Sequence, residues 1–144
     1  MSTATAHHVS MRDTTRPLAV VSALAMTLAI WLIAHPLAGV DLTVSTRAGT
    51  HVEQIGPASV AFATLLAGLA AWGMLAVLER VARRPRMTWT VIASTTLALS
   101  LAAPIGLGQT NSAIAMLTCM HLAAAGILIP TLARSTPRQA RSAA

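Results

Sequence analysis

Four long apolar runs, separated by short polar segments, dominate the pattern of the chain. Each run has about 20 to 22 residues, and a helix of that length extends ~30 Å, enough to cross the hydrocarbon core of a bilayer. The pattern predicts an all-α bundle of four transmembrane helices. The predicted membrane domain is 17–134, with spans at 17–38, 57–78, 88–107 and 113–133. Residues 1–16 and 135–144 are polar and predict disordered tails, and Met11 is an alternative start of the chain.

The longest polar connection, residues 39–56, lies between the first two spans. Residues 42–46 and 50–54 alternate between apolar and polar side chains, and Arg47-Ala48-Gly49 separates them. Alternation on both sides of a glycine-containing turn predicts a short β-hairpin. Because a lone hairpin is marginally stable in water, we expect this one to pack on the helix ends.

The composition supports a membrane protein over a soluble one. Hydrophobic residues make up 55% of the chain and charged residues only 10%, against roughly 25% charged in an average soluble domain. Aromatic residues make up 3%, so stacking platforms for bases are not expected. The single cysteine, Cys119, excludes an intrachain disulfide.

The arginines predict the orientation of the bundle. All ten basic residues are arginines, and nine of them flank the spans on one side, with Arg47 alone on the other. The positive-inside rule places both termini in the cytoplasm and the hairpin outside, in a bacterial plasma membrane.

The placement of the arginines also argues against nucleic acid as the partner of the net charge of +6. The basic segment between the second and third spans is predicted to meet anionic lipid headgroups or a cytoplasmic partner through Arg80, Arg83, Arg84 and Arg86. Trp89 is predicted to anchor the third span at the membrane interface.

A histidine near the middle of the fourth span is the leading candidate site, because an ionisable residue at that depth suggests a function. Serine and threonine side chains on the third span are candidate hydrogen-bond partners. The predicted intramembrane polar site comprises His121, Thr96, Ser100 and Thr118. The simpler interpretation is a hydrogen bond that holds two helices together. The alternative is contact with a ligand, a quinone or a proton.

A second group of polar residues lies outside the membrane. It comprises His35, Asp41, His51 and Glu53. His51 and Glu53 are two apart on a predicted strand, so they share a face and offer mixed nitrogen and oxygen ligands to a divalent cation. Their spacing matches no established metal motif, and the favoured interpretation is a solvated loop without metal.

The sequence predicts no catalytic residues and no cofactor. No carboxylate lies inside a predicted span, which counts against a proton-driven transporter. A haem held between His35 and His121 is not expected, because their predicted depths differ by roughly 7 Å. Cys119 and His121 lie on different sides of their helix, so they do not form a nucleophile–base pair.

Several short segments resemble a known family. They are Trp31 to Val44, Ile55-Gly56-Pro57-Ala58, and Met120-His121-Leu122 with Leu128-Ile129-Pro130. Together they resemble a group of small four-helix membrane proteins of actinobacteria that is catalogued as a domain of unknown function. The resemblance covers about residues 17 to 134. It implies the four-helix fold and brings no activity.

Three functions remain open from the sequence. The leading one is a non-enzymatic integral membrane protein that acts through a membrane-protein partner, a homo-oligomer or a larger complex. The second is a small dimeric transporter or permease-like subunit with His121 lining the path. A cavity joining His121 to Ser100 and Thr96 would favour it, and a tightly packed bundle would oppose it. The third is a redox helper that binds a quinone or a metal.

Overall fold

The computed structural model describes residues 11–45 and 52–136 of the chain. Four of its helical segments are long and apolar enough to cross a membrane, and they coincide with the four predicted spans. The first is α1 (Met11–Leu32) with the π-helical turn η1 (Ile33–Leu37), and the second is α2 (Pro57–Val81). The third is α3 (Pro85–Ser100) with α4 (Ala102–Leu107), and the fourth is α5 (Asn111–Ser135).

Prolines set several of the helix boundaries. Pro57 and Pro85 begin α2 and α3, where the missing N–H has no partner to lose. Inside a helix, a proline ring clashes with the carbonyl four residues earlier. Accordingly, α1 gives way to η1 after Leu32, four residues before Pro36, and α3 ends at Ser100, four residues before Pro104. The predicted third span is therefore two helices with a break between them.

The first helix begins earlier than the sequence predicts. Its first residue is Met11, whereas the predicted span begins at Pro17 and leaves residues 11–16 in a tail. Arg16 stabilises the additional turns, because its guanidinium binds Glu79 of α2 and Ser135 of α5. Residues 1–10 lie outside the described part of the chain.

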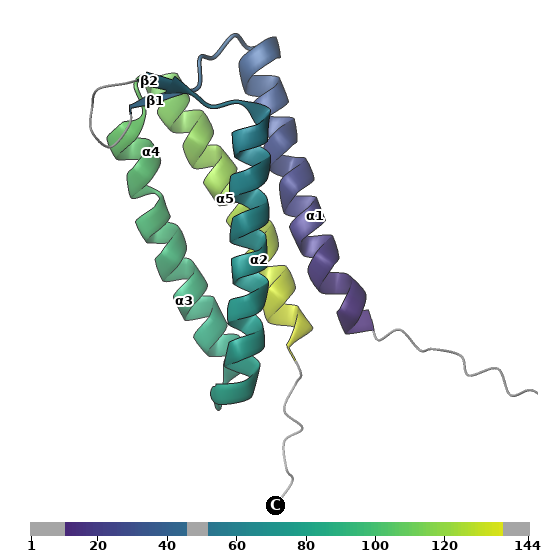
Figure 1. The fold of residues 1–144 in the computed structure, drawn as a ribbon. Helices are drawn as coiled ribbons and strands as arrows, with labels where there is room; N and C mark the ends of the chain where they lie inside the picture. The colour runs from purple at the N-terminus through teal and green to yellow at the C-terminus, as the bar shows by residue number, and fades with distance from the viewer. Residues whose placement is uncertain (1–10, 46–51, 137–144) are drawn as a thin grey trace, which may run out of the picture.

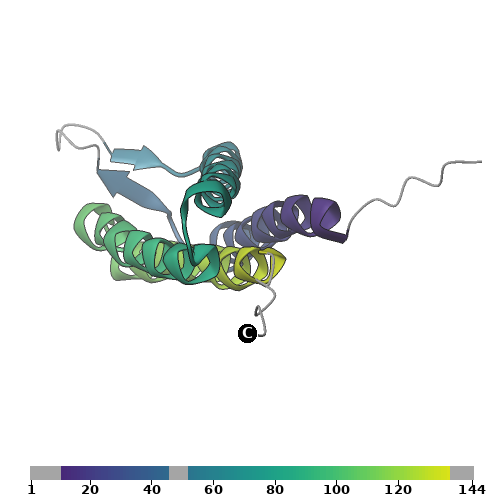
Figure 2. The ribbon, with the colours of Figure 1, turned by 90° about the horizontal axis from the view of Figure 1, so that it is seen from below.

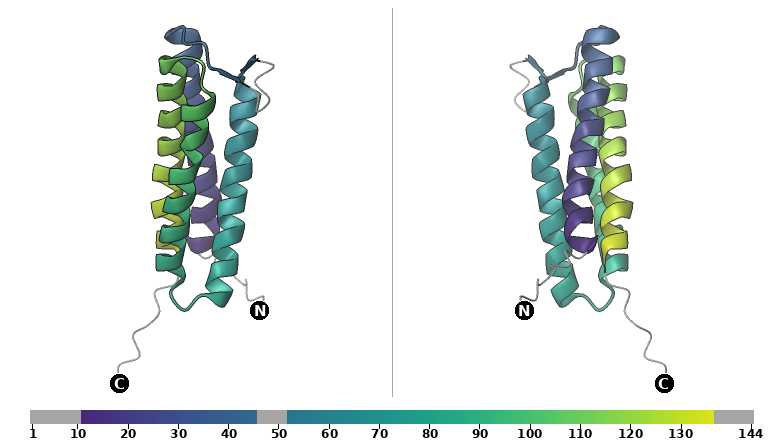
Figure 3. Two further views of the ribbon diagram at one scale, coloured as in Figure 1. Left: turned by 90° about the vertical axis from the view of Figure 1, so that its left-hand side faces the viewer. Right: turned by 90° about the vertical axis from the view of Figure 1, so that its right-hand side faces the viewer.

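The four spans run antiparallel to their neighbours in sequence (Figures 1 and 3). Viewed along the bundle, α3, α5 and α1 form a row, and α2 packs on one side of it (Figure 2). We call one end of the bundle the arginine end: α1 begins there, α2 joins α3 and α5 ends. We call the opposite end, which carries the two strands, the hairpin end.

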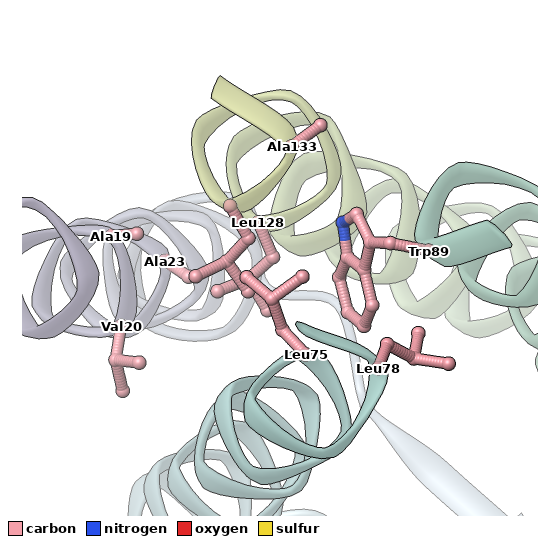
Figure 4. Close-up of a cluster of buried hydrophobic side chains, with 9 residues drawn as sticks. Ala19, Val20, Ala23, Leu75, Leu78, Trp89, Leu128 and Ala133 are labelled. Carbon is pink, nitrogen blue, oxygen red and sulfur yellow. The ribbon is translucent and has the colours of Figure 1, made fainter. Parts of the chain in front are cut away.

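A buried cluster fills the arginine half of the bundle. Figure 4 shows Leu75 of α2 facing Leu128 of α5, and Leu78 of α2 beside the indole of Trp89. Trp89 is only 3% exposed, and its Nε1–H donates to the carbonyl of Ile129 at 3.2 Å. The prediction that Trp89 anchors the third span at the membrane interface was wrong. The residue lies in the first turns of α3 but faces α5, so its ring joins the core.

A second cluster lies beneath the hairpin end. It comprises Ala34, Leu42, Val60, Leu117 and Met120. Leu42 is fully buried, so the segment that leads into the hairpin is held against the helices by apolar packing as well as by hydrogen bonds.

The predicted hairpin is present as β1 (Thr43–Ser45) and β2 (Val52–Gln54), which pair antiparallel with Val44 opposite Glu53. Its predicted turn and His51 lie outside the described residues. On one side, the Trp31 Nε1–H donates to the carbonyl of Ile55 at 2.9 Å. On the other, the Gln109 N–H donates to the carbonyl of Thr43 at 3.2 Å. The hairpin therefore packs on the helix ends, as predicted.

Candidate functional site

A cavity of about 360 Å³ lies beneath the hairpin. Residues of α1, α2 and α5 form its walls, and Val44, Glu53 and Ile55 contribute from the hairpin segment. Eight of its thirteen lining residues are Ala, Val, Ile, Leu or Met. The five polar ones are Thr27, Glu53, Ser59, Thr64 and His121. The cavity thus combines an apolar wall with a few polar groups, which is the composition typical of a small-molecule site.

His121 projects its ring from α5, where it is half-buried. Its Nδ1 lies 2.8 Å from the carbonyl oxygen of Leu117, one helical turn earlier. A carbonyl oxygen only accepts hydrogen bonds, so Nδ1 must carry the proton. The described residues offer Nε2 no hydrogen-bond partner, and this nitrogen is not sealed inside the protein. In the neutral ring, Nε2 therefore carries a lone pair that is open to a ligand.

Two threonines join α1 to α2 at the wall of the cavity. The hydroxyl oxygens of Thr27 and Thr64 lie 3.1 Å apart. Thr27 also contacts the carbonyl oxygens of Ala23 at 3.0 Å and Leu24 at 3.1 Å. All of these contacts are satisfied together when Thr27 donates its single proton to the carbonyls and Thr64 donates to Thr27. With its proton committed, Thr64 presents only acceptor lone pairs to the cavity.

The predicted intramembrane site comes together only in part. His121 lines the cavity, but Thr96, Ser100 and Thr118 are not among the lining residues. Thr96 is exposed, and the Ser100 hydroxyl donates to the Leu97 carbonyl of its own helix at 2.8 Å. The His121 ring is bonded within α5, so the predicted hydrogen bond to the third span is absent from the described part of the chain.

Sequence reasoning missed Thr27, Ser59 and Thr64 as lining residues. A signal was available, because Thr27 and Thr64 are isolated polar residues deep in their apolar runs. A hydroxyl at that depth needs a partner, and each threonine supplies one for the other.

The predicted outer cluster is also divided. The His35 Nδ1–H donates to the carbonyl of Val40 at 3.1 Å, and Nε2 lies 3.4 Å from the amide nitrogen of Gln54. Asp41 is exposed, and His51 lies outside the described residues. Glu53 lines the cavity with His121 instead. Among the described residues, no three His, Cys, Asp or Glu side chains are placed to hold a metal ion.

An ion pair closes the arginine end. Arg16 Nη2 lies 2.6 Å from Glu79 Oε1, and Arg16 Nε donates to the Ser135 hydroxyl at 3.2 Å. One side chain of α1 thereby binds both α2 and α5. The four arginines predicted to meet lipid headgroups are all exposed at this end: Arg80, Arg83, Arg84 and Arg86.

Comparison with known proteins identifies a family but no activity. No curated protein and no solved structure matches the chain. The model of a family described as "Family of unknown function (DUF6069)" matches residues 7–138, and the chain belongs to that family.

Proposed function

We propose that this chain is a multi-pass protein of a bacterial plasma membrane that binds a lipophilic molecule in the cavity beneath its hairpin and does not transform it chemically. The cavity carries the proposal. Its volume of about 360 Å³ lies in the range of roughly 300–1,000 Å³ that small-molecule sites occupy. Its walls come from helices whose outer faces would meet lipid, so a ligand dissolved in the membrane is the natural occupant.

In this proposal the arginine end faces the cytoplasm, with both termini on that side. Every arginine whose side chain the structure describes supports it by lying at that end: Arg16, Arg80, Arg83, Arg84, Arg86 and Arg134. The exposed arginines would meet anionic headgroups of the inner leaflet or a cytoplasmic partner. The hairpin and the cavity then lie toward the outer leaflet.

The second candidate function is a permease-like subunit working as a dimer, with His121 lining the path. The position of His121 on the cavity favours it. Against it, the predicted partners Ser100 and Thr96 do not line the cavity, and the buried cluster around Leu75 and Trp89 fills the half of the bundle below. The cavity lies in the hairpin half of the bundle, and buried side chains fill the arginine half. This arrangement supports ligand binding more than transport across the bundle.

A cavity-filling substitution tests the proposed function. In Ala67→Phe the added ring projects into the cavity, because Ala67 lines it, whereas Ala70→Phe adds the same ring on the same helix outside the lining residues. Fluorescence of the neutral probe N-phenyl-1-naphthylamine would be measured with each protein in lipid nanodiscs, with empty nanodiscs as the background. We expect wild type and Ala70→Phe to bind the probe alike, and Ala67→Phe to bind at least about tenfold more weakly. Equal binding by all three proteins, or none above background, would overturn the proposal.

A further inference from the structure

We propose that the ligand of the cavity is an uncharged amphiphile whose buried polar group is a hydroxyl that donates a hydrogen bond to His121 Nε2. This inference rests on the proposed function and adds the chemical class of the ligand. The juxtaposition that supports it is an open imidazole nitrogen and a proton-committed threonine in one largely apolar cavity.

The polarity of the cavity follows from the bonds its residues already make. His121 uses its Nδ1–H on the Leu117 carbonyl and leaves Nε2 as an acceptor. Thr64 uses its hydroxyl proton on Thr27 and leaves its oxygen as an acceptor. Both deep polar groups therefore accept hydrogen bonds, and a ligand that satisfies them must donate. At these two groups a ketone, an ether or an ester would leave its oxygen facing lone pairs. The Ser59 hydroxyl also lines the cavity, but it is exposed in the first turn of α2.

The charges that line the cavity disfavour ionised head groups. A carboxylate or phosphate would face acceptor groups without a cation among the lining residues. An ammonium group would have one anion among the lining residues, Glu53, but the Glu53 side chain is exposed in the hairpin, where water screens its charge. Burial of an uncompensated charge costs far more free energy than burial of a hydrogen-bonded hydroxyl. A neutral donor with an apolar body is the remaining class.

Two isomeric ligands test the proposal directly. Decanol and methyl nonyl ether have the same atoms and nearly the same shape, but only the alcohol has an O–H donor. Displacement of N-phenyl-1-naphthylamine from nanodisc-embedded protein would give the affinity of each. On the unmodified chain we expect the alcohol to bind about five- to tenfold more tightly, the effect of one hydrogen bond.

Two variants test whether the preference for the alcohol over the ether depends on His121 Nε2. His121→Leu removes the acceptor, so alcohol and ether should then bind equally. Thr118→Val, a conservative change on the same helix outside the lining residues, should retain the preference. A second pair, 2-methylnaphthalene-1,4-diol under anaerobic conditions and its dimethyl ether, distinguishes a quinol from an alkyl alcohol as the source of the hydroxyl.

The outcomes separate the two proposals. If the alcohol and the ether displace the probe equally from wild type, and Ala67→Phe prevents binding of both, the proposed ligand hydroxyl would be refuted. The proposed function would stand. Tighter binding of decylammonium than of decanol would refute the ligand hydroxyl as well. Absence of any saturable displacement would refute the proposed function itself. The comparison of isomers on the unmodified chain needs no variant, so poor folding of His121→Leu cannot obscure it.

Discussion

At the scale of single residues, the described helices carry few hydroxyl groups in their interior, and each is paired. Thr27→Val removes the acceptor of the Thr64 proton, so we expect the free energy of unfolding to fall by about 1 kcal/mol. Thr64→Val should cost less, because Thr27 keeps its carbonyl partners. Replacing both residues by valine removes both polar groups and should cost less than Thr27→Val alone.

Thermal and denaturant unfolding of the purified protein in detergent would measure these differences. A Thr64→Val variant that loses as much stability as Thr27→Val, or more, would contradict the proposed direction of the hydrogen bond between the two hydroxyls. It would also remove one reason for treating Thr64 as an acceptor in the cavity.

At the scale of the elements, the sequence predicts which helices and strands form and where they end. It predicts less well which helix each residue faces. Four apolar runs and an alternating connection were enough to predict four spans and a hairpin, and Pro36 and Pro104 mark where their helices change. The partner of His121 could not be predicted in the same way. In a membrane helix the face toward lipid is as apolar as the face toward a neighbour, so periodicity does not show which way a residue points. Thr96 accordingly proved to be exposed, and Thr27 was overlooked.

The contact of α1 with α2 depends on a glycine. A Cβ placed on Gly68 would lie 2.8 Å from Cγ1 of Val20, a buried and stiff β-branched side chain. We expect Gly68→Ala to force the two helices apart and to lower the free energy of unfolding by about 1–3 kcal/mol. Unfolding in detergent would measure the loss.

Gly73→Ala provides the matched control on the same helix, because nothing lies within 4 Å of the added Cβ. It should leave stability unchanged or raise it slightly through helix propensity. Combining Gly68→Ala with Val20→Ala should cost less than the sum of the two single changes. Additive losses would show that the close approach of α1 and α2 does not limit their packing.

At the scale of the whole molecule, the described arginine side chains and the cavity lie at opposite ends of the bundle. The described arginine side chains gather at the arginine end, where Arg16 joins three helices through Glu79 and Ser135. The polar groups of the cavity lie in the other half, beneath the hairpin. The sequence predicted the first asymmetry from the positions of the arginines. It could not predict the second, because the cavity forms only where α1, α2 and α5 converge with the hairpin.

This asymmetry makes the orientation in the membrane testable. In a Cys119→Ala background, Asp41→Cys places a thiol at the hairpin end and Ala82→Cys places one in the connection between α2 and α3. The positive-inside rule predicts that a membrane-impermeant maleimide labels only Asp41→Cys in intact spheroplasts and labels both after permeabilisation. Labelling of Ala82→Cys alone in intact spheroplasts would show that the bundle has the opposite orientation in the membrane. The cavity would then open toward the cytoplasmic leaflet, and its ligand would have to be sought among molecules of that side.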